Sequence, residues 1–171
     1  MADERGIRPL VLQAEALLRA LAQHEVEFVI IGGFALAAHG VVRATKDIDI
    51  VPAPALDNLG RLARALDAVG AEVIVADDFD PAELGIGPDE AGLALGGNWV
   101  FRTDLGRLDV MQDVAGMKSY DTVRAASVER EVPGAGAFRF CGLDDLIAMK
   151  AAAGRPQDEL DIASLQRARG E

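Results

Sequence analysis

The sequence predicts an α/β fold in which a mixed, strongly twisted sheet is flanked by helices. Short β-branched and apolar runs are typical of buried strands, and apolar residues spaced three or four apart are typical of amphipathic helices. At 171 residues, 50% of them hydrophobic and 26% charged, the chain can bury a core. We expect a core domain over residues 1–142 and a C-terminal helical hairpin over 143–171, packed together as one compact unit.

The first half of the chain contains both patterns. Leu17, Leu18 and Leu21 lie on the apolar face of a helix, and Pro54 suits the first turn of another helix, which Gly70 ends. In order, we expect a helix over 9–25, a strand over 29–31, a short helix from residue 32, a strand over 47–51, a helix over 54–69 and a short strand over 72–76. Residues 77–97 are rich in Gly, Pro and Asp and predict a long loop with one short helix near 81–84.

The second half continues in the same way. Strands over 98–102 and 107–112 are joined by a tight turn, and a loop with a short helix over 116–126 follows. Two further strands, over 128–132 and 138–141, precede helices over 143–153 and 157–169, which Gly154-Arg155-Pro156 separates.

Composition and charge disfavour membrane proteins, secreted proteins and general nucleic-acid binders. No apolar run is long enough to span a bilayer, and the segment Met1-Ala2-Asp3-Glu4-Arg5 lacks the basic start of a signal peptide, so we expect a cytoplasmic protein with no membrane contact. A single cysteine, Cys141, fits a reducing compartment, and we interpret it as a core residue and not a nucleophile. A net charge of −11 argues against a general nucleic-acid binder, although a local basic patch could still hold one.

A pair of glycines follows the first strand. Val29, Ile30 and Ile31 form a β-branched run, and Gly32 and Gly33 then let the backbone approach a ligand closely and open a helix. The free N–H groups at such a helix start suit a triphosphate. Taken alone, a Gly-Gly pair is more often only a turn.

Two carboxylates lie on the next strand. Asp47 and Asp49 are two residues apart, so their side chains share one face, roughly 7 Å apart along the chain. Ile48 and Ile50 then point into a core. Paired carboxylates beside a phosphate site are what a divalent metal needs to bridge protein and nucleotide, whereas a lone Asp-x-Asp is more often a solvated face.

A third carboxylate lies on a later strand. Asp109 is flanked by Leu108 and Val110, which face the other way, and aspartate is depleted in strands, so its placement needs compensation. We favour metal coordination together with Asp47 and Asp49. The alternative is a salt bridge with Arg107 or Arg102.

Arg43 and Thr45 lie in the loop before the aspartate pair. The guanidinium of Arg43 could meet a phosphate through a bidentate fork, or it could form a salt bridge to Asp47 or Asp49 that holds the loop. Thr45 could hydrogen-bond the same turn. His39 ends the short helix after the glycines, where we favour a structural role.

These motifs together resemble those of the nucleotidyltransferase superfamily related to DNA polymerase beta: a Gly-Gly turn, a spacer, and Asp-x-Asp on a strand. The form Arg43-x-Thr45-x-Asp47-Ile48-Asp49 is most similar to small bacterial nucleotidyltransferases of the AbiEii type, known from toxin–antitoxin systems. The resemblance implies a minimal nucleotidyltransferase fold with the C-terminal hairpin closing one side of the cleft.

The C-terminal helices extend the resemblance. Lys150, Arg155, Asp158 and Asp161 resemble the AbiEii-type pattern of Lys, Arg and Lys/Arg-Asp-x-x-Asp, with Gln157 where that group often has a basic residue. By this resemblance, Lys150 contacts nucleotide phosphate and Asp161 lies near the site in a supporting or base role. The alternative is an amphipathic hairpin with these charges in surface salt bridges.

The resemblance implies metal-dependent transfer of a nucleoside monophosphate from an NTP to a hydroxyl. Asp47, Asp49 and Asp109 would be the metal ligands and catalytic residues, with two Mg²⁺ ions and Mn²⁺ as the alternative. Gly32, Gly33, Arg43, Thr45 and Lys150 would bind the nucleotide. Asp109 is also the candidate to accept the hydroxyl proton.

The acceptor is left open by the resemblance: a tRNA 3′ end, a protein hydroxyl or a small molecule such as an aminoglycoside, which an acidic cleft would suit. A toxin role would imply a cognate antitoxin protein as a partner. The alternative from another class is a non-catalytic member that binds a nucleotide or a protein partner.

Overall fold

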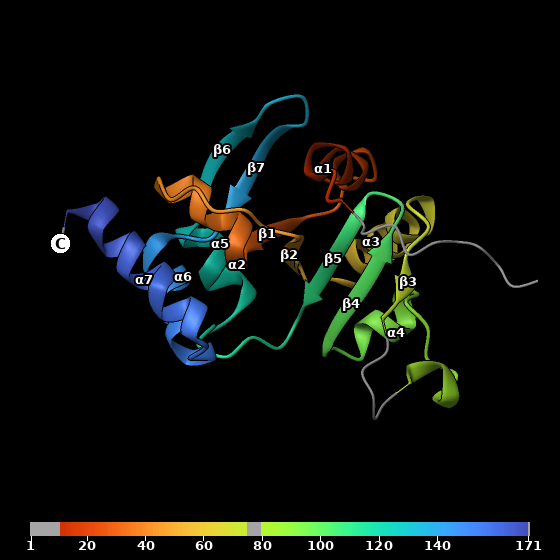
Figure 1. Cartoon of the computed structure of the whole chain (residues 1–171). Coiled ribbons are helices and arrows are strands. Elements are labelled where there is room, and N and C mark those ends of the chain that lie inside the picture. The colour runs from red at the N-terminus through yellow and green to blue at the C-terminus, as the bar shows by residue number, and fades with distance from the viewer. Residues whose placement is uncertain (1–10, 75–79, 171) are drawn as a thin grey trace, which may run out of the picture.

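A seven-stranded mixed sheet runs through the molecule (Figure 1). The computed structural model describes residues 11–74 and 80–170, and the sheet order is β3-β4-β5-β2-β1-β7-β6. Strand β2 pairs with β1 antiparallel and with β5 parallel. The strands are β1 (Phe28–Ile31), β2 (Asp47–Pro52), β3 (Glu72–Val73), β4 (Asn98–Thr103), β5 (Gly106–Met111), β6 (Val128–Val132) and β7 (Gly136–Phe140).

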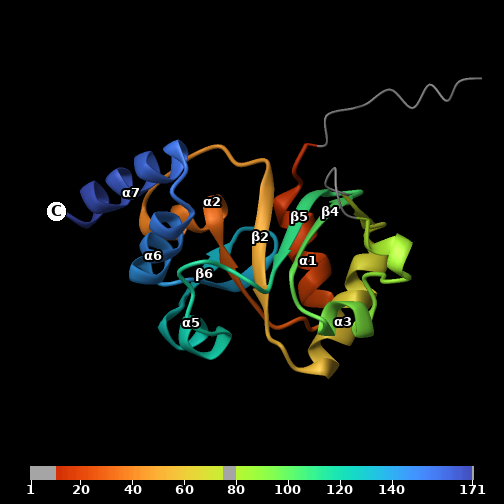
Figure 2. The same cartoon turned by 90° about the horizontal axis from the view of Figure 1, so that it is seen from below.

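Helices flank the sheet and divide between its two ends. Helices α6 and α7 lie at one end, near the C-terminus, whereas α3 lies at the other end with β4 (Figure 1, Figure 2). The helices are α1 (Ala14–Gln23), α2 (Gly32–Ala35), η1 (Leu36–His39), α3 (Leu56–Ala68), η2 (Pro81–Leu84), α4 (Glu90–Ala94), α5 (Tyr120–Ala126), α6 (Leu143–Ala153) and α7 (Pro156–Arg169). The predicted fold class, a mixed sheet flanked by helices, is confirmed.

The two faces of β2 have different roles. Ile48 and Ile50 are fully buried, and so are Leu108 and Val110 on the neighbouring β5. These four side chains join one hydrophobic core with the apolar faces of α1 and α3. Because side chains alternate along a strand, Asp47 and Asp49 lie on the opposite face, as predicted.

Several boundaries differ from the prediction. Helix α1 begins at Ala14, and residues 9 and 10 of the predicted helix lie outside the described residues. Strand β3 ends at Val73, and the rest of the predicted strand mostly lies outside the described residues. Helix α4 was missed, because it is short and contains a glycine, which favours helix weakly. Glycine is needed at position 92, because a Cβ there would strike the carbonyl oxygen of Gly87.

The C-terminal helices form the expected pair. Gly154 has a left-handed conformation that ends α6, and Pro156 starts α7 two residues later. The division into a core and an appended hairpin stays a prediction. Within the described ranges, none of the helices combines the length and the apolar character that crossing a bilayer would require.

Candidate active site

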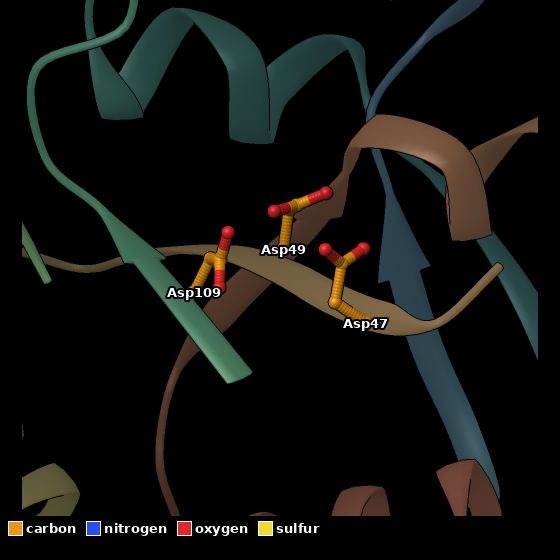
Figure 3. Close-up of side chains that lie close together, drawn as sticks. All are labelled: Asp47, Asp49 and Asp109. Atoms are coloured by element: carbon orange, nitrogen blue, oxygen red, sulfur yellow. The ribbon is translucent and has the colours of Figure 1, made fainter. Parts of the chain in front are cut away.

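Three carboxylates converge at the middle of the sheet. The parallel register of β2 and β5 places Asp49 opposite Asp109, and Asp47 lies two residues before Asp49 on the same face. Each of the three offers an oxygen, and these oxygens lie within 4.8 Å of one another. Figure 3 shows the three side chains turned toward one another from the two strands. This acidic triad (Asp47, Asp49 and Asp109) could hold a metal ion.

The electrostatics of the triad fit a cation. Burial raises the pKa of Asp49, and the neighbouring charges of Asp47 and Asp109 raise it further, to about 7. A carboxyl with so high a pKa is held among like charges at a cost in free energy. A hard divalent cation, which prefers carboxylate oxygens, would relieve that repulsion.

Arg107 is the nearest cation to the triad among the described residues. Its Nε–H donates to Oδ1 of Asp109 at 2.8 Å and its Nη2–H to Oδ2 at 2.9 Å. The Nε also lies 3.6 Å from Oδ2 of Asp47. The salt bridge that the sequence offered as the alternative to metal coordination is therefore present, on the same carboxylates that form the triad.

The two glycines lie directly against the site. Gly32 has φ +70°, and a Cβ there would strike the carboxylate of Asp49. A Cβ at Gly33 would come within 3.0 Å of Nη2 of Arg43 and 3.4 Å of Oγ1 of Thr45. Glycine at these positions lets the backbone of α2 approach the triad closely.

Arg43 does not form the salt bridge with Asp47 or Asp49 that was the alternative to phosphate binding. Its Nη2–H instead donates to Oδ2 of Asp161 at 3.0 Å. Thr45 does hydrogen-bond its own turn, because its hydroxyl donates to the carbonyl oxygen of Asp47 at 3.0 Å. The loop before β2 is thus tied both to the triad strand and to α7.

A buried ion-pair cluster joins α6, α7 and this loop. The Nζ of Lys150 donates to Oδ2 of Asp161 at 2.8 Å, and Nε2 of Gln157 donates to Oδ1 at 2.9 Å. The side chains of Lys150 and Asp161 are only 5% and 3% exposed. The alternative of surface salt bridges for this pair was therefore wrong, since the pair is buried.

Asp158 belongs to the same cluster and was not among the predicted site residues. It accepts hydrogen bonds from the Nε–H of Arg155 at 2.7 Å and from the backbone N–H of Arg155 at 3.1 Å, and it lies 3.6 Å from Nζ of Lys150. Its signal in the sequence is an acidic residue three positions after a helix N-cap, as in a capping box. The buried ion-pair cluster consists of the buried Lys150, Asp158 and Asp161 together with Arg43 and Arg155, which pair with them from the edge and are 34% and 73% exposed.

The cluster is electrostatically satisfied. Burial raises the pKa of Asp161, but hydrogen bonds from Lys150 and Gln157 outweigh it and hold that pKa below its usual value. Burial likewise raises the pKa of Asp158, and hydrogen bonds from Arg155 outweigh it. With three cations against two carboxylates, the cluster carries one positive charge in excess.

A cleft of about 780 Å³ is lined by residues of both groups. One part of the lining, from β2 and β5, carries the acidic triad, and another part, from the loop before β2 and the α6–α7 pair, carries Arg43, Lys150 and Arg155. Gly32, Gly33 and Thr45 also line it. The volume is that of a typical small-molecule site. Asp161 does not line the cleft, and it acts on the cleft through the lining residues that donate to it: Arg43, Lys150 and Gln157.

His39 and Cys141 have structural roles, as predicted. Nε2 of His39 lies 2.8 Å from the carbonyl oxygen of Cys141, so the ring ties η1 to the chain after β7. Burial raises the pKa of the Cys141 thiol to about 12, which removes it as a nucleophile near neutral pH.

Comparison with known proteins supports the fold. No protein-family model matches the sequence, and no curated protein matches it. Solved structures do resemble the chain, among them three with TM-scores of 0.53 to 0.60. The lincosamide antibiotic adenylyltransferase LnuA has a TM-score of 0.60 at 12% identity, over 91% of this chain and 97% of that protein.

The other two structures match at similar identity. The antibiotic-resistance factor ANT(2″)-Ia has a TM-score of 0.54 at 17% identity, over 89% of this chain and 78% of that protein. An antigenic nucleotidyltransferase-like protein from Paracoccidioides brasiliensis has a TM-score of 0.53 at 18% identity, over 88% of this chain and 72% of that protein. At these identities the likeness is one of fold, and the chain has the fold of these nucleotidyltransferase structures.

Proposed function

We propose that this protein is a metal-dependent nucleotidyltransferase that moves a nucleoside monophosphate from an NTP to a hydroxyl acceptor and releases pyrophosphate. The observation that carries the proposal is the acidic triad in a cleft whose lining also carries the cations Arg43, Lys150 and Arg155. A divalent ion and a polyphosphate together would match these two parts of the lining in charge.

Asp47, Asp49 and Asp109 are the proposed metal ligands, for two Mg²⁺ ions or for Mn²⁺. When bound, such ions polarise the α-phosphate and lower the pKa of the attacking hydroxyl. The donor set fits a hard cation, because all three ligands are carboxylate oxygens and the raised pKa of Asp49 falls when a cation replaces the proton.

The nucleotide phosphates are proposed to lie on the α2, α6 and α7 side of the cleft. There Gly32 and Gly33 line the cleft, and the side chains of Arg43 and Arg155 are 34% and 73% exposed although each is paired with a carboxylate. Lys150 lines the same wall, but its ammonium lies between Asp158 and Asp161. Its charge would support phosphate binding while these carboxylates hold it in place.

Asp161 is proposed as a positioning residue. All of its described hydrogen bonds are accepted from Arg43, Lys150 and Gln157, and its lowered pKa makes it a poor base. The base role that the resemblance also implied is better suited to Asp109, which lies on β5 and lines the cleft.

The acceptor is proposed to be a small hydroxyl compound with cationic character. The β5 side of the cleft carries the exposed Asp113 in addition to the triad, and the chain's net charge of −11 disfavours RNA. Two structures of the same fold are named for antibiotics or antibiotic resistance. The toxin role, with its antitoxin partner, remains a prediction that growth arrest on expression would test.

The test is calorimetric titration of each of the four NTPs, with and without Mg²⁺, on the wild type, on Asp49→Asn and on Asp121→Asn. Asp121 is an exposed carboxylate on α5 outside the cleft lining, so its variant matches the loss of charge. We expect Mg²⁺-dependent binding of at least one NTP, lost in Asp49→Asn and kept in Asp121→Asn. Absence of binding in the wild type with every NTP would overturn the proposal.

A further inference from the structure

Arg107 contacts two of the three carboxylates of the triad, Asp109 and Asp47. Its fork engages both oxygens of Asp109 at 2.8 and 2.9 Å and approaches Asp47 at 3.6 Å. Asp47 and Asp109 are also two of the three carboxylates whose oxygens lie within 4.8 Å of one another. The guanidinium therefore lies where the oxygens would hold a cation.

If a divalent ion and this guanidinium bound the same oxygens, they would repel each other. An ion bound by the triad would lie in direct contact with oxygens that Arg107 already contacts at hydrogen-bond distance. The two like charges would then be only a few ångströms apart in a partly buried site, where Coulomb repulsion is weakly screened. Metal binding must therefore displace the guanidinium or be weakened by it.

Arg107 is able to leave. Its side chain is 45% exposed, whereas that of its partner Asp109 is 10% exposed. The contrast is with Lys150, which is 5% exposed and held by two buried carboxylates. Arg107 also lines the cleft, so its displaced guanidinium would remain in the space that the nucleotide is proposed to fill.

We propose that Arg107 is an internal counter-ion that fills the cation site of the metal-free protein and is displaced when the metal binds. The proposal rests on the proposed function, because it takes the triad as a metal site. In the metal-free state the guanidinium compensates three crowded carboxylates. Metal entry then requires loss of this ion pair, so Arg107 lowers the affinity of the triad for a free divalent ion.

The test is titration of Mn²⁺ alone, by calorimetry, into the full chain after treatment with EDTA. We compare the wild type with Arg107→Gln, Arg107→Lys and Arg102→Gln. Arg102 is the control, because it lies opposite Arg107 in the β4–β5 register and is exposed, so its variant removes the same charge from the same face.

We expect Arg107→Gln to bind Mn²⁺ about tenfold more tightly than the wild type, because no internal cation has to be displaced. Arg107→Lys should fall between the two, and Arg102→Gln should stay within about twofold of the wild type. Thermal unfolding is the second measurement: Arg107→Gln should unfold at a lower temperature than the wild type in EDTA, and Mn²⁺ should remove that difference.

A merely structural salt bridge would give a different result. Arg107→Gln would then bind Mn²⁺ equally or more weakly than the wild type, because the triad would lose its order, and this outcome would overturn the inference while leaving the proposed function standing. If neither the wild type nor any variant binds Mn²⁺, the triad is not a metal site and the proposed function fails as well.

Discussion

Two groups of charged side chains line the same cleft and are compensated to opposite degrees. In the acidic triad, three carboxylates share one partly exposed guanidinium, and the pKa of Asp49 is raised to about 7. In the buried ion-pair cluster, two carboxylates receive hydrogen bonds from three cations, and the pKa values of Asp158 and Asp161 are lowered. The pKa of an aspartate is therefore raised in the triad and lowered in the cluster.

The difference in charge compensation distinguishes the triad, which has room for an added cation, from the cluster, whose charges are already paired. The carboxylates of the cluster are already compensated, and their ion pairs hold Arg43, Lys150 and the loop before β2 in place. The triad carries three carboxylates against one contacting guanidinium and could hold an added cation. The same substitution, aspartate to asparagine, should therefore have opposite effects on stability in the two places.

The largest effect is expected at Asp161. Asp161→Asn leaves the buried ammonium of Lys150 with only the more distant carboxylate of Asp158, at 3.6 Å. Breaking a buried ion pair by removing one partner costs about 3 kcal/mol or more. We expect the free energy of unfolding at pH 7, measured by urea denaturation, to fall by about 3 kcal/mol.

Asp57→Asn is the matched control. Asp57 pairs with Arg61 one turn along α3 and is 74% exposed, so its variant should lose much less stability than Asp161→Asn. The loss at Asp161 should also shrink at acid pH, once the wild-type carboxyl is protonated below its lowered folded pKa. Equal losses in the two variants would show that the cluster is no more than a set of surface ion pairs.

The opposite sign is expected at Asp49 in the metal-free protein. The folded pKa of about 7 exceeds the unfolded value of 3.8, so the folded state binds the extra proton and stability falls as pH rises from about 4 to about 7. Asp49→Asn removes this loss. In EDTA at pH 8 we expect the variant to be more stable than the wild type by about 2 kcal/mol, less than the full shift implies because the site is partly exposed.

The pH and metal dependence make this prediction specific. Thermal or urea unfolding in EDTA should show the difference shrinking to zero near pH 4, where Asp49 is protonated in the folded wild type. Saturating Mg²⁺ should stabilise the wild type and not the variant. A variant that is less stable than the wild type at pH 8 without metal would mean that the triad is as well compensated as the cluster.

The local parts of this arrangement could be predicted from the sequence. A spacing of two placed Asp47 and Asp49 on one face and Ile48 and Ile50 in the core, because the alternation of a strand depends only on neighbouring residues. Gly154 and Pro156 likewise fixed the break between α6 and α7.

The partners of the charged residues could not be predicted in the same way. Arg43 and Asp161 are 118 positions apart, and only the packing of α7 brings them to 3.0 Å. Arg107 was named as one of two alternative partners of Asp109, but the simultaneous approach of its guanidinium to Asp47 depends on the β2–β5 register. Ion pairs between distant elements leave no periodic signal in a chain.

The smallest effect is expected at the residue that departs from the AbiEii-type pattern. Gln157 is exposed, lines the cleft and donates to Oδ1 of Asp161. Gln157→Lys would add a cation to a wall that already carries one positive charge in excess. Because an exposed ion pair is worth about 0.2–1 kcal/mol, we expect NTP binding in Mg²⁺ to tighten by about two- to fourfold, with little change in stability.

Gln166→Lys controls for the added charge. Gln166 is exposed on the same helix but does not line the cleft, so its variant should bind NTP as the wild type does, and the gain at Gln157 should decrease with added salt because exposed charges are screened. Equal effects of the two lysines would mean that the nucleotide senses only the overall charge of the protein. A loss of affinity in Gln157→Lys alone would mean that the phosphates bind elsewhere. The ion-pair cluster would then serve only to stabilise the fold. The contrast between the triad and the cluster would concern stability and not substrate binding.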